Sequence, residues 1–103
     1  MNKHEYPNLG ETLYEEVLPN GLSVLVAVKP GFRKNAAFFA TRYGGADRRF
    51  KVNGEWIDTP AGVAHFLEHK MFDMPDGRNV LSDFAALGAS PNAFTGTGHT
   101  AYY

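Results

Sequence analysis

Two histidines and one glutamate lie close together in the segment GVAHFLEHKMF, residues 62–72. At about 100° per residue along a helix, His65 and His69 lie roughly 40° apart, and Glu68 lies roughly 60° from His65 on its other side. All three side chains therefore share one helix face. Two neutral imidazoles one turn apart can bind zinc, and a nearby carboxylate can take a proton from metal-bound water. The spacing predicts part of a zinc hydrolase site.

The order of the three residues is the inverse of the commoner His-Glu-x-x-His arrangement, because Glu68 directly precedes the second histidine. The inversion preserves the geometry, since the glutamate still lies roughly 60° from one histidine and roughly 100° from the other. The alternative is a solvated helix face on which three polar residues meet by chance, as happens with short motifs. The flanking sequence favours the metal site.

A helix beginning near Thr59 would position these side chains. Thr59 is a favourable N-cap, and Pro60 is a favourable first helical residue. Phe72 lies on the histidine side, either near the metal or in the core. We expect the opposite, apolar face to anchor the helix in the core; it consists of Val63, Ala64, Phe66, Leu67 and Met71.

The rest of the chain contains strands on both sides of a helix pair. Turn residues Pro19-Asn20-Gly21 predict a hairpin, and Asn53-Gly54 predicts a second turn inside a long loop. The expected elements are strands 11–18, 22–29 and 36–43, a loop over 44–58, the helix after Thr59, a second helix over 79–87 ended by Gly88, and strands 90–95 and 99–103. This order favours an α+β fold, an antiparallel sheet with helices packed on one face, over a parallel doubly wound fold.

The segment GVAHFLEHKMF closely resembles the active-site helix of the pitrilysin/insulinase family of zinc metallopeptidases. The resemblance extends along nearly the whole chain in the family's order. LPNGLSVLVAVKP (18–30) is similar to the opening strand pair, AFFATRYGGADRRF (37–50) to the next strand and turn, and GASPNAFTGTGHTAYY (88–103) to the strand region after the second helix. Bacterial insulinase-like zinc peptidases are the members that it resembles most.

The resemblance implies a role for each matching residue. His65 and His69 match the two zinc-binding histidines, and Glu68 matches the general base on zinc-bound water. Asn92 and Ala93 match an edge strand that binds the extended substrate backbone, although Asn92 after Pro91 could also be an ordinary turn residue.

The family's third zinc ligand is a glutamate on a later helix, and no glutamate follows His69. The downstream carboxylates, Asp73, Asp76 and Asp83, do not match its position. We therefore expect residues 1–103 to be the N-terminal part of one metallopeptidase domain, truncated before the third zinc ligand and inactive alone. The other two histidines are not expected to bind metal, because His4 lies in a terminus that should fray and His99 lies on a late strand.

Composition excludes several classes of protein. The net charge of −1 and a pI of about 6.4 give no electrostatic case for nucleic-acid binding. The absence of cysteine rules out disulfides and thiolate ligands and suits a reducing compartment, so a cytoplasmic location is expected. The start MNKHEYPNLGE lacks the apolar run of a secretory signal or a membrane span.

The leading hypothesis is a zinc-dependent endopeptidase that hydrolyses peptides or small unfolded proteins. The expected partners are the substrate and the remaining domains of the same parent chain or a homologous subunit, with neither nucleic acid nor membrane. One alternative is a non-catalytic or assembly subunit of a processing-peptidase-like complex. Another is an unrelated two-histidine metal-binding module, which should bind zinc tightly as the 103-residue chain alone.

Overall fold

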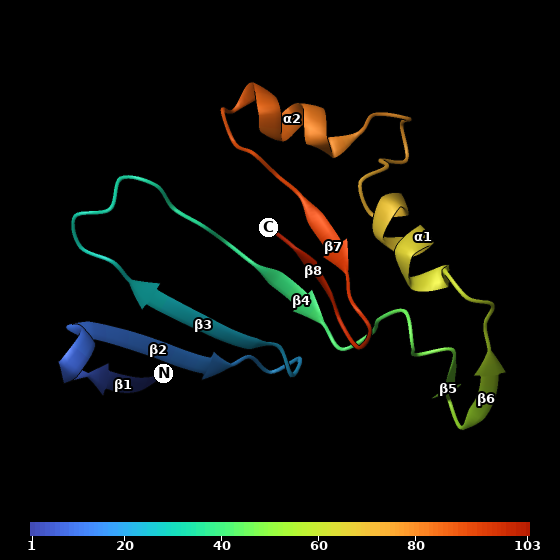
Figure 1. Ribbon diagram of the computed structural model, residues 1–103, viewed down its shortest axis with the longest axis horizontal. Coiled ribbons are helices and arrows are strands. Elements are labelled where there is room, and N and C mark those ends of the chain that lie inside the picture. Colours follow the sequence, from blue (N-terminus) through green and yellow to red (C-terminus); the bar gives the residue numbers. More distant parts are fainter. The chain divides into compact units, whose positions relative to one another are not determined.

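The computed structural model describes residues 1–103 and divides into two compact units, Met1–Asn35 and Ala36–Tyr103. The chain forms eight strands, two α-helices and one short 3-10 helix, Pro7–Leu9. Figure 1 labels the strands and the α-helices. All strand pairs are antiparallel, so the α+β class predicted from the sequence is confirmed. The strands form three small sheets rather than one. No helix has the length and apolar character needed to span a membrane.

The first unit is a three-stranded sheet in the order β1-β2-β3. Its strands are β1 (Asn2–Tyr6), β2 (Glu11–Val17) and β3 (Ser23–Val28). The predicted hairpin is confirmed: Gly21 has φ 85°, and its N–H donates to the carbonyl of Leu18 over 2.8 Å. The prediction of a frayed terminus is wrong, because His4 pairs with Leu13 and its Nε2 lies 3.1 Å from the Glu15 carboxylate. Cross-strand polar pairs thus order a segment without apolar alternation.

The second unit contains the sheet β4-β8-β7. Its strands are β4 (Phe39–Thr41), β8 (Thr100–Tyr102) and β7 (Ala93–Thr95). The central strand β8 pairs with both neighbours, and Thr95 lies opposite Thr100. Because side chains alternate along a strand, Ala93 and Thr95 point to the same face of the sheet. The other edge of β7 has no strand partner.

The predicted loop over 44–58 contains a second hairpin, formed by β5 (Arg49–Val52) and β6 (Glu55–Asp58). Its turn is the predicted Asn53-Gly54 pair, with φ values of 51° and 88°. The expectation of an irregular loop is wrong because the charged residues support the pairing. The Arg49 and Lys51 cations lie 4.9 and 5.0 Å from the centre of the Trp56 ring.

The first helix, α1 (Val63–Lys70), begins later than predicted. Thr59 does not cap it, because the hydroxyl and N–H of Thr59 both donate to the carbonyl of Arg48, over 3.1 and 2.7 Å. The N-cap is Gly62, whose φ of 89° suits glycine. The second helix, α2 (Val80–Ala86), agrees with its prediction, with Asn79 as N-cap and Leu87 as C-cap.

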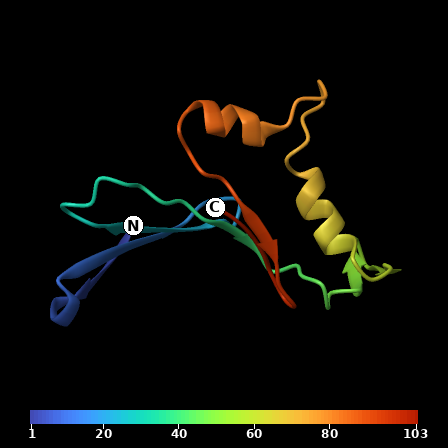
Figure 2. The same cartoon turned by 45° about the horizontal axis from the view of Figure 1, so that its top comes forward.

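The face of α1 that packs inward agrees only in part with the predicted one. In both views α1 lies beside β7 (Figures 1 and 2). Its buried residues are Ala64 and Glu68, which lie one turn apart, whereas Phe66 is 64% exposed and Leu67 and Met71 are also exposed. Of the predicted apolar anchor, only Ala64 is buried within residues 1–103, because the sheet covers the side of the helix that carries Ala64 and Glu68.

Candidate metal centre

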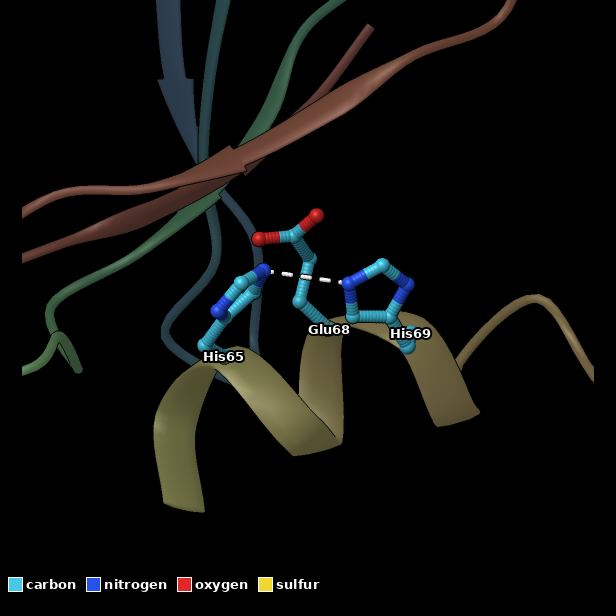
Figure 3. A group of neighbouring side chains, drawn as sticks. All are labelled: His65, Glu68 and His69. Atoms are coloured by element: carbon cyan, nitrogen blue, oxygen red, sulfur yellow. Dashed lines mark hydrogen bonds between the residues drawn. The ribbon is translucent and has the colours of Figure 1, made fainter. Parts of the chain in front are cut away.

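Helix α1 brings His65, Glu68 and His69 into one group, as the helical spacing predicted. The Nε2 atoms of the two histidines lie 3.0 Å apart, and one donor atom of each residue lies within 4.8 Å of the others. Figure 3 shows the two rings turned toward each other, with the Glu68 carboxylate extending past them toward the strands. No other group of three histidine or carboxylate side chains in the structure is as close.

The two imidazoles fit a zinc ion. At 3.0 Å, one Nε2 donates a hydrogen and the other accepts it. Two nitrogens that bind tetrahedral zinc at 2.0 to 2.1 Å would lie about 3.3 Å apart, so a small side-chain rotation would suffice. Bound metal would take the place of the shared hydrogen, since both nitrogens would then need their lone pairs.

Glu68 is held from the sheet by a residue that the sequence did not single out. Only 7% of Glu68 is exposed, and the Thr95 hydroxyl donates to its Oε2 over 2.5 Å. The Thr100 hydroxyl lies 3.5 Å from that of Thr95 and donates to the carbonyl of Tyr43 over 2.8 Å. The sequence did contain one indication for Thr95. It follows Ala93 by two residues in a predicted strand, so the two side chains must lie on the same face of the sheet.

Tyr102 lies near the Glu68 carboxylate, and Phe72 packs on Tyr102. Burial raises the pKa of the Tyr102 phenol, and the negative charge of Glu68 raises it further. Phe72 packs edge to face on Tyr102, with ring centroids 5.8 Å apart. Of the two predictions for Phe72, packing against the sheet is the one that this contact favours.

Asn92 and Ala93 lie at the free edge of the sheet. Asn92 exchanges two backbone hydrogen bonds with Tyr103, of 2.7 and 2.8 Å, and Ala93 begins β7. In an antiparallel ladder the next residue along, Ala93, therefore directs its own N–H and C=O away from β8. The Asn92 side-chain oxygen accepts from the Ala93 N–H over 2.9 Å. Within residues 1–103 both residues lie on the outer side of this sheet, and Asn92 belongs to the ladder rather than to a turn. Substrate binding there stays a prediction.

Comparison with known proteins assigns the chain to a family. Residues 54–103 match the family model described as insulinase (peptidase family M16). The chain is 52% identical over 100 residues to the "Uncharacterized zinc protease YmfH" of Bacillus subtilis strain 168, across 95% of this chain and 23% of that protein. This chain belongs to the insulinase family.

Two further relatives agree with the assignment to the insulinase family. The crystal structure of an M16-like peptidase from Alicyclobacillus acidocaldarius superposes with a TM-score of 0.84 at 44% identity, covering 96% of this chain and 22% of that one. The mitochondrial-processing peptidase subunit beta of Dictyostelium discoideum is 37% identical over 62 residues, covering 48% of this chain and 13% of that one. The chain thus spans less than a quarter of the length of these insulinase-family relatives.

The other ligand-type residues of this insulinase-family chain lie outside the group. His99 packs edge to face on Phe94, with ring centroids 5.4 Å apart. The downstream aspartates pair with cations instead: Asp73 with Lys70 over 2.8 Å, and Asp76 and Asp83 with Arg78 over 2.7 and 3.1 Å. The hydrogen bond and charge of Lys70 lower the pKa of the Asp73 carboxyl. The two histidines therefore receive no third protein ligand from these aspartates.

Proposed function

We propose that the complete protein containing residues 1–103 is a zinc-dependent endopeptidase that hydrolyses peptides or small unfolded proteins. The observation that carries this proposal is the pair of facing Nε2 atoms on His65 and His69 beside the buried Glu68. Membership of a peptidase family supports it, as do relatives named zinc proteases.

The chain's own residues divide the chemistry among them. Bound zinc would supply a Lewis acid that polarises the scissile carbonyl and lowers the pKa of a water molecule. His65 and His69 would hold the metal through Nε2. Glu68 accepts the proton of the attacking water on Oε1, because Oε2 is already engaged by Thr95, and then delivers it to the leaving amine. The Ala93 carbonyl at the free edge accepts a main-chain hydrogen bond from the extended substrate backbone, whereas the Ala93 N–H is held by the side-chain oxygen of Asn92.

In this proposal residues 1–103 are the N-terminal part of one metallopeptidase domain. The third zinc ligand, the expected glutamate, lies in another part of the complete protein, which acts in the cytoplasm. The length of the relatives supports this arrangement, since the chain covers 23% of the Bacillus protein. The remaining domains of the same protein, or a homologous subunit, would complete the substrate chamber, and the likeness to a processing-peptidase subunit supports the latter.

The test is Glu68→Gln in the complete protein, which removes the base but keeps the shape of the side chain. We expect kcat for peptide hydrolysis to fall by about 100-fold or more, with the zinc content unchanged. Glu55→Gln, on the exposed strand β6, is the matched control and should leave turnover unaltered. Undiminished hydrolysis by Glu68→Gln would refute the general-base role.

The same measurements address the alternatives. A complete wild-type protein that binds zinc stoichiometrically but cleaves no peptide would support the non-catalytic subunit instead. Membership of the insulinase family already contradicts the unrelated two-histidine module.

A further inference from the structure

The Glu68 carboxylate depends on one hydroxyl from the neighbouring sheet. We propose that Thr95 is a positioning residue, which holds Oε2 of Glu68 so that Oε1 faces the water to be activated. This inference rests on the proposed function and deepens it by assigning a task to a residue outside the His65-Glu68-His69 motif.

The first argument is the need of a buried carboxylate for a donor. Glu68 is 7% exposed, and burying a charged oxygen without a hydrogen bond is costly. The Thr95 hydroxyl is the protein group that donates to it, and its 2.5 Å separation suits a hydroxyl bound to a carboxylate. Without this bond the carboxylate could rotate about the last torsion of its side chain, which has a broad energy profile.

The second argument is that the donor itself is fixed. Thr95 lies opposite Thr100 in the β7-β8 ladder, and Thr100 is only 2% exposed. A hydroxyl has one hydrogen, and that of Thr100 points to the carbonyl of Tyr43, 2.8 Å away. The longer 3.5 Å approach between the two threonine hydroxyls is therefore weak. Thr95 donates its hydrogen to Glu68, because the carboxylate oxygen lies 2.5 Å away and the Thr100 oxygen 3.5 Å away. A strand of the sheet therefore sets the orientation of a side chain on the helix.

The third argument is the division of the carboxylate into two roles. Thr95 engages Oε2 alone, and the structure shows no hydrogen bond to Oε1. Figure 3 shows the carboxylate beside the facing histidine rings. A base needs one oxygen free and aimed, because proton transfer requires hydrogen-bond reach to the reacting water. Loss of the Thr95 hydroxyl should then slow the chemical step more than it weakens substrate binding.

The experiment compares Thr95→Val and Thr95→Ser in the complete protein. Valine keeps the branched shape and removes the donor, whereas serine keeps the donor. We expect Thr95→Val to lower kcat by roughly 10- to 100-fold, with KM and zinc content unchanged, and Thr95→Ser to restore most of the loss. Thr41→Val is the matched control, because Thr41 lies on β4 of the same sheet and its hydroxyl makes no hydrogen bond to the metal-centre group.

Each other outcome overturns the inference. Thr95→Val with kcat within about twofold of the wild type, Thr95→Ser as slow as Thr95→Val, or loss of zinc in Thr95→Val would each do so. If Thr95→Val does not fold, Thr95→Ala and Thr95→Ser make the same comparison. If the wild type is active and Thr95→Val has the same kcat, only this inference fails. If the wild type shows no zinc-dependent hydrolysis, the proposed function fails as well.

Discussion

Gly44 is the residue with the least room for a side chain. A Cβ at this position would lie 2.5 Å from the backbone nitrogen of His99 and 2.6 Å from the carbonyl oxygens of Gly96 and Thr97. These atoms form the turn between β7 and β8, and the following Gly45 N–H donates to the Gly96 carbonyl over 2.9 Å. Backbone packs directly on backbone here, so no flexible side chain can move aside.

Gly44→Ala should therefore lower the free energy of unfolding by about 1–3 kcal/mol, the usual cost of overpacking, or prevent folding. Urea denaturation of the complete protein measures the change. Gly45→Ala is the control: its Cβ would meet only the Gly96 carbonyl oxygen, at 3.7 Å, which is an ordinary contact. Equal stability of the two variants would contradict the prediction.

The residues of the metal centre differ in how far a sequence could reveal them. His65, Glu68 and His69 were predicted because the helical period alone brings them together, and that period is local. Thr95 was not, because its bond to Glu68 joins positions 27 residues apart and exists only when β7 lies against α1. A contact within one helix can be predicted from the helical repeat. A contact between a helix and a strand depends on how the two pack, and the sequence pattern does not give that.

At the scale of elements, α2 begins at a side-chain cap that can be tested by itself. Asn79 accepts the N–H of Leu81 on its side-chain oxygen over 3.0 Å, and it has the extended backbone of an N-cap. Within residues 1–103 no residue of α2 is buried, so the contacts that this part of the protein gives its first turn are mainly those of the cap. The cap must therefore carry much of the stability of that turn.

Asn79→Ala should make α2 easier to open by about 1 kcal/mol, which speeds hydrogen exchange of its amides about fivefold. Asn79→Asp keeps the acceptor and adds a charge that the helix N-terminus favours, so its exchange should stay close to that of the wild type. Hydrogen exchange of residues 80–86 in the complete protein measures both. Unchanged exchange in Asn79→Ala would show that the cap is dispensable.

The two helix starts illustrate what sequence patterns can predict about elements. The start of α2 was predicted within one residue, because Asn79 caps through a bond to Leu81, two positions away. The start of α1 was misplaced, because Thr59 is also a good capping residue but uses its hydroxyl on Arg48, eleven positions back and directly before β5. The tendency of a residue to cap a helix depends on its neighbours in the sequence. An acceptor distant in the sequence, here the Arg48 carbonyl, can bind the hydroxyl instead, and the residues around Thr59 do not reveal it.

At the scale of the whole molecule, residues 1–103 leave most of their apolar side chains uncovered. The buried apolar residues are Ala64 and Ala101, although 44% of the residues are hydrophobic. That share of hydrophobic residues is ample for a core, but composition cannot tell which other part of a protein covers an apolar face. The exposed apolar residues occur in both units and include Phe32 and Leu25 in the first and Phe38, Phe66 and Leu87 in the second.

The solvent-accessible surface area shows how much surface residues 1–103 leave uncovered. It measures 8571 Å². A folded monomer of the same mass, 11.4 kDa, exposes about 5,800 Å², and two separate compact bodies the size of the two units would together expose about 6,900 Å². The excess on this chain is therefore about 1,700 to 2,800 Å², which exceeds the roughly 1,000 Å² that each partner buries in a large obligate interface at the lower end of its range. In the complete protein we expect other segments to cover these faces.

Residues 1–103 expressed alone should therefore behave as a loosely packed chain without peptidase activity. We expect it to bind a dye specific for exposed apolar surface, to exchange most amides rapidly, and to unfold in urea without a cooperative transition, since too little apolar area is buried to offset chain entropy. The complete protein is the control and should show slow exchange and a cooperative transition. A cooperative, dye-free 103-residue chain would show instead that the two units are stable with their apolar faces in water.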